Sequence, residues 1–278
     1  MKVKLIADSG STKADWKLIR DNSEPVSFQT RGMNPYFRTA GDICEEMEEK
    51  VVPFAGRVDA VYFYGAGITQ RENIVQETLL QLFPGAVVET HSDVLGASRA
   101  LFGREAGIAC TLGTGSNACY YDGNEVAEKV PPLGFILGDE CSGSAFGKKL
   151  LGDYFKQIMP PSLRKMFEDE FSPALADVLD HVYRIERPNR YLASFAPFLS
   201  AHMEEDYCRK MVEESFDEFF RRNVLTLSVA NNHEVRFTGS VAFYFSEIFS
   251  RRTEAFGFKR PFILKEPVTG LVTYHKNL

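Results

Sequence analysis

The sequence predicts an α/β protein made of two similar lobes that share a cleft. Three observations lead to this fold class. The first hundred or so residues alternate β-like and helical patterns, which indicates a sheet sandwiched by helices. One strand–turn–strand unit occurs twice, and an internal repeat of this kind decides the architecture. No low-complexity linker interrupts the chain, so the repeat itself sets the expected lobes at residues 1–106 and 107–278.

The first copy of the unit opens the chain. The β-like run 3–7 leads into a turn with the sequence DSGSTKA at residues 8–14, and the segment 15–19 returns as a second strand. Glycine lets a ligand approach the backbone closely, and successive N–H groups at such a turn can converge on an anion. The composition of this turn therefore suits phosphate.

The second copy has the sequence LGTGSNAC at residues 112–119, between an apolar run at 106–112 and a β-like run at 118–121. Its segment 114–117 aligns with residues 9–12 of the first copy. Taken alone, this stretch is equally compatible with a tight hairpin turn that binds no ligand. The repeat favours two phosphate loops, one from each lobe, facing the shared cleft.

Only the first copy begins with an acidic residue, Asp8. A carboxylate among phosphate-binding amides is repulsive unless a hard cation such as Mg²⁺ bridges the two charges. The asymmetry between the copies therefore predicts that the cleft binds a metal–nucleotide complex.

The rest of the first lobe follows the alternation. We expect, in order, a turn at 33–36, a helix at 41–52, a strand at 58–64, a helix at 71–83, a strand at 87–93 and a helix at 94–102. Ligands of such sheets gather at the carboxyl ends of the strands. Three candidate site residues stand at those ends, namely Asp8, Gly67 and Asp93.

Asp93 has two interpretations. An Asp side chain accepts hydrogen bonds from the first N–H groups of a helix, so Asp93 can simply cap the helix at 94–102. It can also act as a general base where a substrate hydroxyl reaches it. The position alone leaves both roles open.

In the second lobe, an apolar run ends in the acidic pair Asp139 and Glu140, and small residues follow at 142–144. An N-capped helix explains this pattern, although the small residues would also admit a ligand. Residues 160–226 are expected to be largely helical. Three phenylalanines in this region are expected in the core, namely Phe216, Phe219 and Phe220.

The end of the chain holds two further strands. A strand at 234–238 runs into Gly239 and Ser240, and a helix is expected from residue 241. Such a strand–glycine–helix junction suits a nucleotide base or ribose lying against the backbone. A short strand at 262–264 and a bend at 267–272, which enters a final apolar segment, complete the expected fold.

Composition excludes several functional classes. Hydrophobic residues make up 44% and charged residues 25% of the 278, as is ordinary for a globular protein. A net charge of −6 without a long basic run argues against nucleic-acid binding. No apolar segment approaches the ~20 residues needed to cross a bilayer, and no signal-peptide pattern opens the chain. Five cysteines lack Cys-x-x-Cys spacing and five histidines are scattered, so we expect free thiols, no zinc site and a cytoplasmic protein.

The motifs taken together resemble a known group. DSGSTKADW, THSD, LGTGSN, LGDECSGS and FTGSVA follow one another in an order similar to that of the N-acetylglucosamine kinases, within the actin-like ATPase and sugar kinase superfamily. The likeness runs from about residue 3 to 272 and extends to the activator ATPases of 2-hydroxyacyl-CoA dehydratases. It implies two lobes of ribonuclease H-like topology around a nucleotide cleft.

The resemblance also implies roles for matching residues. Asp93 would be the catalytic base, and Asp8 would hold Mg²⁺ directly or through water. The implied contacts of ATP are Ser11, Thr12 and Lys13 in the first loop, Thr114 and Gly115 in the second, and Gly239 and Ser240 at the nucleoside. The implied sugar contacts are Asn34, Asn117 and Asp139, to which we add Gly67 from its place at a strand end. Cys141 stands where this group usually has glycine, and the chain is shorter than many relatives around residues 160–225.

The leading interpretation is an ATP-dependent kinase of an amino sugar, N-acetylglucosamine first, with ATP and Mg²⁺ as cofactors. Its expected partner is a small-molecule sugar, and a homodimer stays open. One alternative is an ATPase that switches a partner enzyme, as the dehydratase activators do, and another is a sugar sensor without catalysis. The activators hold an iron–sulfur cluster through thiolates, and no cysteine here matches their arrangement. Intact Asp8 and Asp93 count against the sensor.

Overall fold

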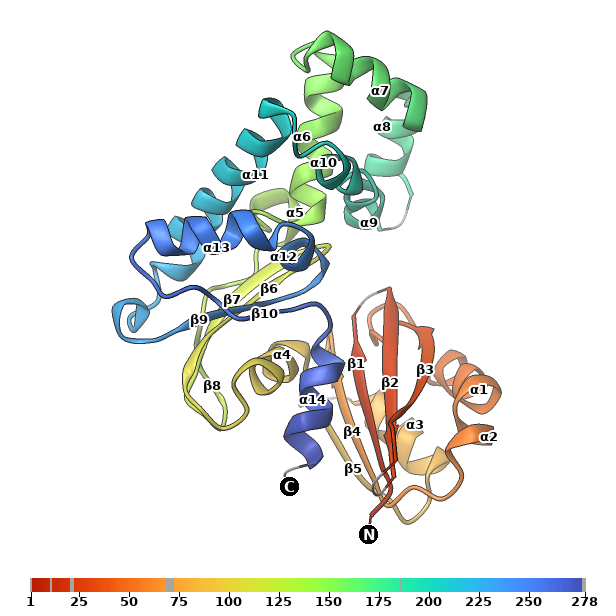
Figure 1. Cartoon of the computed structure of the whole chain (residues 1–278). Coiled ribbons are helices and arrows are strands. Elements are labelled where there is room, and N and C mark those ends of the chain that lie inside the picture. The colour runs from red at the N-terminus through yellow and green to blue at the C-terminus, as the bar shows by residue number, and fades with distance from the viewer. Residues whose placement is uncertain (1, 11, 21–22, 69–72, 186, 277–278) are drawn as a thin grey trace. The chain divides into compact units, whose positions relative to one another are not determined.

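The computed structural model describes residues 2–10, 12–20, 23–68, 73–185 and 187–276, and it folds into two compact units (Figure 1). Unit 1 comprises Met1–Glu105, Tyr121–Val126 and Glu266–Leu278. Unit 2 comprises Ala106–Tyr120 and Ala127–Lys265. The last segment of the chain therefore belongs to the same unit as the first.

The sheet of unit 1 has five strands in the order β3-β2-β1-β4-β5. The strands are β1 (Lys4–Ser9), β2 (Lys13–Ile19), β3 (Val26–Arg31), β4 (Ala60–Gly65) and β5 (Val87–Ser92). β1 pairs antiparallel with β2 and parallel with β4, and β4 pairs parallel with β5. The hairpin and the two later strands agree with the sequence analysis, whereas β3 was not expected.

Successive residues of β1 enter different cores, because the side chains of a strand point alternately to opposite faces. Leu5 and Ala7 pack with residues of α1 (Ala40–Lys50), α2 (Val52–Ala55) and α3 (Ile74–Leu82). Ile6 packs on the other face, with Leu271 and Val272. Figure 1 shows these three helices on one side of the sheet, and α4 (Asp93–Phe102) and α14 (Pro267–Lys276) on the other.

Helix α14 corrects the expectation for the end of the chain. The predicted bend at 267–272 is instead the start of this helix, with Pro267 at its first position, where a missing N–H costs nothing. Gly270 lets the helix come close to α4, because a β-carbon there would lie 2.3 Å from the carbonyl oxygen of Ala100. Tertiary packing therefore stabilises a helix that the amino-acid sequence alone did not indicate.

The sheet of unit 2 repeats the plan of unit 1, with the order β10-β9-β6-β7-β8. Its strands are β6 (Gly107–Leu112), β7 (Ser116–Tyr121), β8 (Val126–Lys129), β9 (Val235–Thr238) and β10 (Ile263–Leu264). The first three strands of each unit are sequential neighbours, and a fourth and a fifth strand add on the side of the first. The repeat that the two turns predicted is confirmed, and the fold is the two-lobed α/β class.

Most of the helices of unit 2 lie between β8 and β9. They are α5 (Gly134–Leu137), α6 (Gly143–Phe155), α7 (Pro161–Phe171), α8 (Leu175–Tyr183), α9 (Pro188–Ala193), α10 (Pro197–Ala201), α11 (Asp206–Phe219), a π-helical turn at Phe220–Val224 and a 3₁₀ turn at Ala230–Asn232. Two more, α12 (Ser240–Tyr244) and α13 (Ser246–Ala255), follow β9. The phenylalanines at 216, 219 and 220 are fully buried, so their predicted place in the core is confirmed.

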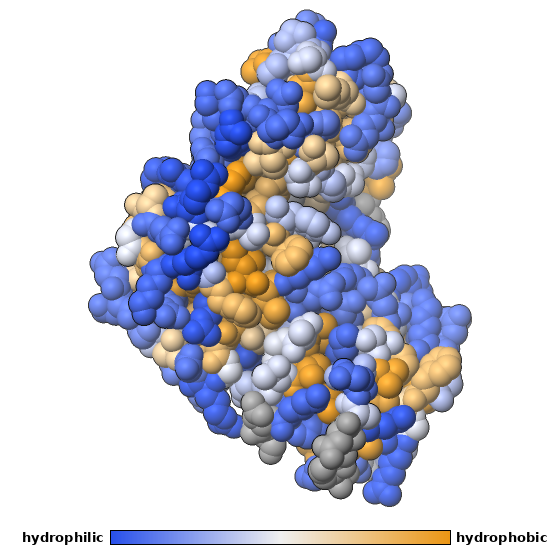
Figure 2. Space-filling view, in the orientation of Figure 1, coloured by the Kyte–Doolittle hydropathy of each residue, from blue (hydrophilic) through white to orange (hydrophobic). Residues whose placement is uncertain are grey.

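The face of the molecule seen in Figure 2 is mostly hydrophilic. In this view apolar residues are exposed around α12 and β10 of unit 2, and the exposed aromatic side chains of this region are Phe243, Tyr244 and Phe262. Within the described ranges, no helix combines the length and the apolar character needed to cross a membrane.

Candidate active site in two half-sites

The carboxyl ends of β1 and β5 place two aspartates at one edge of the sheet in unit 1. Asp8 is the second-last residue of β1, and Asp93 directly follows β5 as the first residue of α4. Desolvation raises the pKa of the Asp8 carboxyl to about 7, and the negative charges of Asp93 and Asp15 add to this effect. The positive charge of Lys13 opposes it. The edge is therefore crowded with negative charge that a cation would relieve.

The residue that caps α4 is Ser92, and this contradicts the first of the two interpretations of Asp93, in which Asp93 caps this helix. The backbone of Ser92 is extended, and its Oγ accepts the N–H of Leu95 at 3.2 Å, as an N-cap side chain does. Asp93 lies one position inside the helix, where its Oδ1 accepts the N–H of Val94 at 2.9 Å. The helix start is thus secured by Ser92, so capping alone does not account for Asp93.

The first turn that is expected to bind phosphate follows β1. The N–H of Gly10 donates to the carbonyl of Lys13 at 3.0 Å, and the carbonyl of Thr12 accepts the N–H of Gly32 at 2.9 Å. Lys13 Nζ lies 2.8 Å from a carboxylate oxygen of Asp15 and 3.7 Å from one of Glu266. Burial works against the charged ammonium, but the hydrogen bond to Asp15 and the surrounding carboxylates raise the pKa of Lys13. Ser11, also expected at the phosphates, lies outside the described residues.

Asn34 and Gly67, two expected sugar contacts, lie side by side in unit 1. Asn34 is buried, and its Oδ1 accepts the N–H of Tyr36 at 3.0 Å. Gly67 has a positive φ of 78°, and a β-carbon there would lie 2.4 Å from Asn34 Oδ1. The segment that contains Asn34 is held to the end of β1, because Ser9 Oγ accepts the N–H of Met33 at 2.9 Å.

In unit 2 the second turn that is expected to bind phosphate is hydrogen-bonded to the start of α6. The N–H of Gly143 donates to the carbonyl of Gly113 at 2.8 Å, and the N–H of Ser144 donates to the carbonyl of Thr114 at 3.2 Å. A β-carbon on Gly115 would lie 3.0 Å from a carboxylate oxygen of Asp139. Glycine at this position therefore leaves room for that carboxylate.

Asp139 is held by the second turn. Its Oδ1 accepts the N–H of Ser116 at 3.1 Å. Burial raises the pKa of Asp139 despite this bond, and the charge of Glu140 adds to the rise. Asp139 and Cys141 both have positive φ, 57° and 59°. Because side-chain-bearing residues rarely adopt this conformation, the geometry explains why glycine suits position 141.

The junction that is expected to contact the nucleoside follows β9. Gly239 has a φ of 113°, and a β-carbon there would lie 2.3 Å from the carbonyl oxygen of Leu112. Its N–H donates to the carbonyl of Leu264 at 3.1 Å. Ser240 is the first residue of α12. The glycine is thus required by close packing of β9 against β6, whether or not a nucleoside binds.

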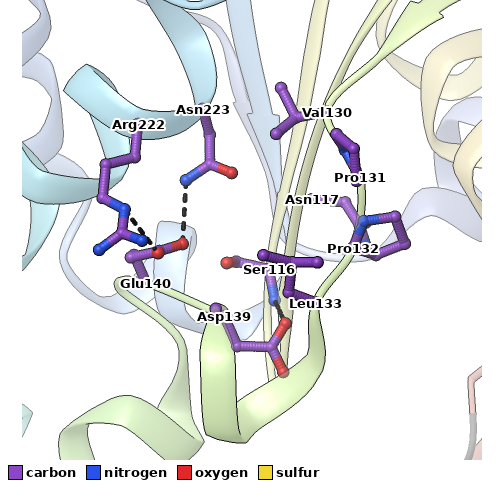
Figure 3. A pocket seen from close by; sticks show the side chains of 11 residues that line it. Ser116, Asn117, Val130, Pro131, Pro132, Leu133, Asp139, Glu140, Arg222 and Asn223 are labelled. Atoms are coloured by element: carbon purple, nitrogen blue, oxygen red, sulfur yellow. Dashed lines mark hydrogen bonds and ion pairs between the residues drawn. The ribbon is translucent and has the colours of Figure 1, made fainter.

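A pocket in unit 2 brings two expected sugar contacts together (Figure 3). Its volume is about 80 Å³. It is lined by Ser116, Asn117, Val130, Pro131, Pro132, Leu133, Gly138, Asp139, Glu140, Arg222 and Asn223. Asn117 and Asp139 were expected at the sugar. The sequence analysis did not anticipate the others as site residues, and Arg222 and Asn223 come from the distant π-helical turn.

The fold is the two-lobed fold of the actin-like ATPases and sugar kinases. The chain is 40% identical to the "putative N-acetylglucosamine kinase" of Porphyromonas gingivalis, over 98% of each chain and with a TM-score of 0.92. The chain therefore belongs to the family of that protein, the N-acetylglucosamine kinase-like proteins.

Two more distant structures share the fold alone. The chain is 14% identical to the "putative N-acetylglucosamine kinase" of Chromobacterium violaceum, over 99% of each chain and with a TM-score of 0.78. It is 13% identical to a ROK family glucokinase of Streptomyces griseus, solved in complex with glucose and AMPPNP, over 99% of this chain and 98% of the other, with a TM-score of 0.60. No protein-family model and no curated protein matches the chain.

Proposed function

We propose that the protein is an ATP-dependent kinase that transfers a phosphoryl group to a hydroxyl of N-acetylglucosamine, with Asp93 as the general base. The observation that carries the proposal is the acidic sheet edge of Asp8 and Asp93, in a chain whose relative at 40% identity is described as a "putative N-acetylglucosamine kinase". An enzyme of this class needs a base, a metal-holding carboxylate and a polar sugar pocket. The residues suited to these tasks are present in the two units.

Each residue would have a limited task, because phosphoryl transfer depends mainly on positioning and on stabilising charge. Asp93 would accept the proton of the attacking sugar hydroxyl. Lys13 would exchange its ion pair with Asp15 for the phosphates of ATP, together with Thr12, and the turn at Thr114 and Gly115 would supply backbone N–H groups. Asn117 and Asp139 would hold sugar hydroxyls.

The carboxylates of unit 1 suit Mg²⁺ that arrives with ATP. The described residues contain no group of three or more side chains able to form a metal site by themselves. Mg²⁺, however, is usually bound through one or two carboxylates and the phosphates of its substrate. Burial, and then the negative charges of Asp93 and Asp15, raise the pKa of Asp8, and such a cation would offset the repulsion between these charges. When bound, Mg²⁺ would neutralise charge on the phosphates, and Asp8 would be its protein ligand.

The test is the release of ADP from Mg-ATP in the presence of N-acetylglucosamine, N-acetylmannosamine, glucosamine and glucose. We expect strong stimulation by N-acetylglucosamine in the wild type and a loss of about 100-fold or more in kcat for Asp93→Asn, with nucleotide binding retained. Asp169→Asn makes the same chemical change at an exposed helix position and is the matched control. A turnover that no sugar stimulates and that Asp93→Asn leaves unchanged would sink the proposal.

That last outcome would favour an ATPase switch, but the cysteines do not support the cluster-bearing type. Four of the five are buried, and Cys44 is half-buried. Burial raises the pKa of Cys110 and of Cys141 well above the usual range, so both thiols resist the ionisation that ligation of iron requires. The kinase therefore remains the function we propose.

A further inference from the structure

The pocket of unit 2 has two chemically different walls (Figure 3). One wall is apolar and consists of Val130 and the adjoining residues 131–133. The other is polar and consists of Glu140, Arg222 and Asn223. A ligand group that fills this space must offer an apolar surface on one side and a hydrogen-bonding group on the other.

Glu140 fixes the orientation of the Asn223 amide. The Glu140 side chain is 12% exposed, and one carboxylate oxygen pairs with Arg222 Nε at 3.0 Å. The other oxygen accepts Asn223 Nδ2 at 3.1 Å. A carboxylate in an ion pair only accepts hydrogen bonds, so the NH₂ group of Asn223 must face it. The carbonyl oxygen of Asn223 is then directed away from Glu140, and Figure 3 shows it on the side of Val130.

The π-helical turn at the end of α11 supplies both partners of Glu140. The N–H of Leu225 donates to the carbonyl of Phe220 at 2.9 Å, five positions back. This turn adds a residue relative to an α-helix, and such turns recur at functional sites. Phe220 and Val224 are buried in the core, which anchors the turn on both sides of Arg222 and Asn223.

We propose that this pocket binds the acetamido group of the sugar and that Asn223 is a specificity-determining residue. Asn223 Oδ1 accepts the amide N–H of the sugar, and the acetyl methyl group packs against Val130 and its neighbours. Glu140 and Arg222 are positioning residues that keep the acceptor oxygen of Asn223 turned to the ligand. The inference deepens the proposed function, since it takes the amino sugar of that reaction as the ligand.

The volume of the pocket suits one substituent of a sugar rather than a whole ligand. Pockets that enclose a whole drug-sized ligand start at about 300 Å³, and this pocket measures about 80 Å³. A hydroxyl at the same sugar position could bond to Asn223, but it would leave the apolar wall uncovered. An acetamido group satisfies both walls at once, so the pocket distinguishes an N-acetyl sugar from glucose.

The experiment compares Asn223→Ala with the wild type in the affinity for N-acetylglucosamine and for glucose, by calorimetry without turnover and by KM in the kinase assay. Loss of one hydrogen bond corresponds to a weakening of about 2-fold to 12-fold. We expect this factor in the ratio of the two affinities, with kcat for N-acetylglucosamine changed by less than about 2-fold. The matched control is Arg221→Ala on the same turn, whose partner Asp217 lies outside the pocket lining, and it should leave the ratio unchanged.

Two further readouts separate selectivity from damage to the fold. In Glu140→Gln the side chain at position 140 can donate as well as accept hydrogen bonds, so it no longer fixes the orientation of the Asn223 amide. This variant should lower the ratio of the affinity for N-acetylglucosamine to that for glucose. Glu140→Asp keeps a carboxylate and should retain part of this ratio. In the wild type, saturation-transfer NMR should show stronger saturation of the acetyl methyl protons than of the ring protons. An equal loss of both sugars in Asn223→Ala, or weak saturation of the methyl group, would overturn the inference.

The failure of this inference is distinguishable from the failure of the proposed function. If the wild type phosphorylates N-acetylglucosamine but Asn223→Ala keeps the wild-type ratio, the kinase stands and the acetamido pocket is wrong. If the wild type binds N-acetylglucosamine through Asn223 without any sugar-dependent turnover, the pocket stands and the kinase is wrong. A wild type that binds neither sugar would overturn both.

Discussion

Protonation of His275 is expected to destabilise unit 1 by about 2 kcal/mol between pH 8 and pH 5. His275 lies on α14 and is 1% exposed. Its Nε2 lies 2.9 Å from the hydroxyl of Tyr64, and its ring stacks on Tyr62 with the centroids 3.9 Å apart. The Tyr64 oxygen also accepts a hydrogen bond from Arg99 at 3.0 Å, so the Tyr64 proton is available to His275. This arrangement favours the neutral imidazole.

The magnitude follows from linkage between protonation and folding. Burial, and then the positive charges of Arg99 and Lys4, lower the pKa of His275 to about 3 in the folded protein. An unfolded histidine titrates near pH 6.5. Between these values the unfolded state binds the extra proton, so stability rises with pH and is lost as the pH falls from about 6.5 towards 3. The two pKa values give the loss of about 2 kcal/mol at pH 5.

The assay is unfolding in urea followed by the fluorescence of Trp16. This residue is the one tryptophan of the sequence and is buried in unit 1, so its signal reports on the unit that contains His275. We expect the wild type to lose about 2 kcal/mol more than His275→Gln between pH 8 and pH 5, because glutamine does not titrate. His181→Gln, in unit 2, should behave as the wild type does. Equal losses in the wild type and in His275→Gln would refute the reasoning.

Three further predictions concern single residues. Because Asp8 titrates near pH 7 and must be ionised to hold a cation, kcat/KM for Mg-ATP should fall about tenfold per pH unit below 7, and a profile flat down to pH 5 would contradict this role. Glu46 is 3% exposed and forms an ion pair with the buried Arg38. Glu46→Ala should therefore lower the free energy of unfolding in urea by about 3–5 kcal/mol. The control Glu45→Ala, at an exposed position, should lower it by less than ~0.5 kcal/mol. A β-carbon on Gly147 of α6 would lie 1.7 Å from a backbone oxygen, whereas Gly152 of the same helix has open space. Gly147→Ala should therefore lower the melting temperature and Gly152→Ala should not, and similar melting temperatures would refute the packing argument.

The strands that the sequence predicted are those whose pattern is local. The β1–β2 hairpin and the β6–β7 pair each consist of apolar runs joined by a glycine-containing turn, which can be recognised without knowing the fold. β3 was missed because it is an edge strand, with one of its six residues buried. Helix α14 was missed because Pro267 and Gly270 resemble a bend in the sequence, while contacts with α4 and the sheet stabilise the helix.

The site residues that the sequence did not reveal are likewise those that no local pattern marks. Ser92 and Asp93 both have side chains that cap helices, and only the extended backbone of Ser92 identifies it as the cap. Asn223 is 83 positions away from Glu140 in the sequence. No sequence pattern marks the π-helical turn that brings Asn223 to Glu140. Arg222 belongs to a pair of arginines that is typical of an exposed helix. Only the folded structure brings these residues to the pocket.

The two copies of the repeat share a strand order but differ in the charged residues at their turns. In the alignment of the copies, Asp8 corresponds to Gly113, so the second turn has no acid of its own. Unit 2 obtains its carboxylate from Asp139, which reaches the turn from a separate segment and is held by the N–H of Ser116. Burial is the largest cause that raises the pKa of both carboxyl groups. For Asp8 the next causes are the negative charges of Asp93 and Asp15, whereas for Asp139 the next cause is the hydrogen bond from Ser116, which lowers the pKa. Under the proposed function, the first arrangement would hold the cation of Mg-ATP and the second would hold the neutral sugar.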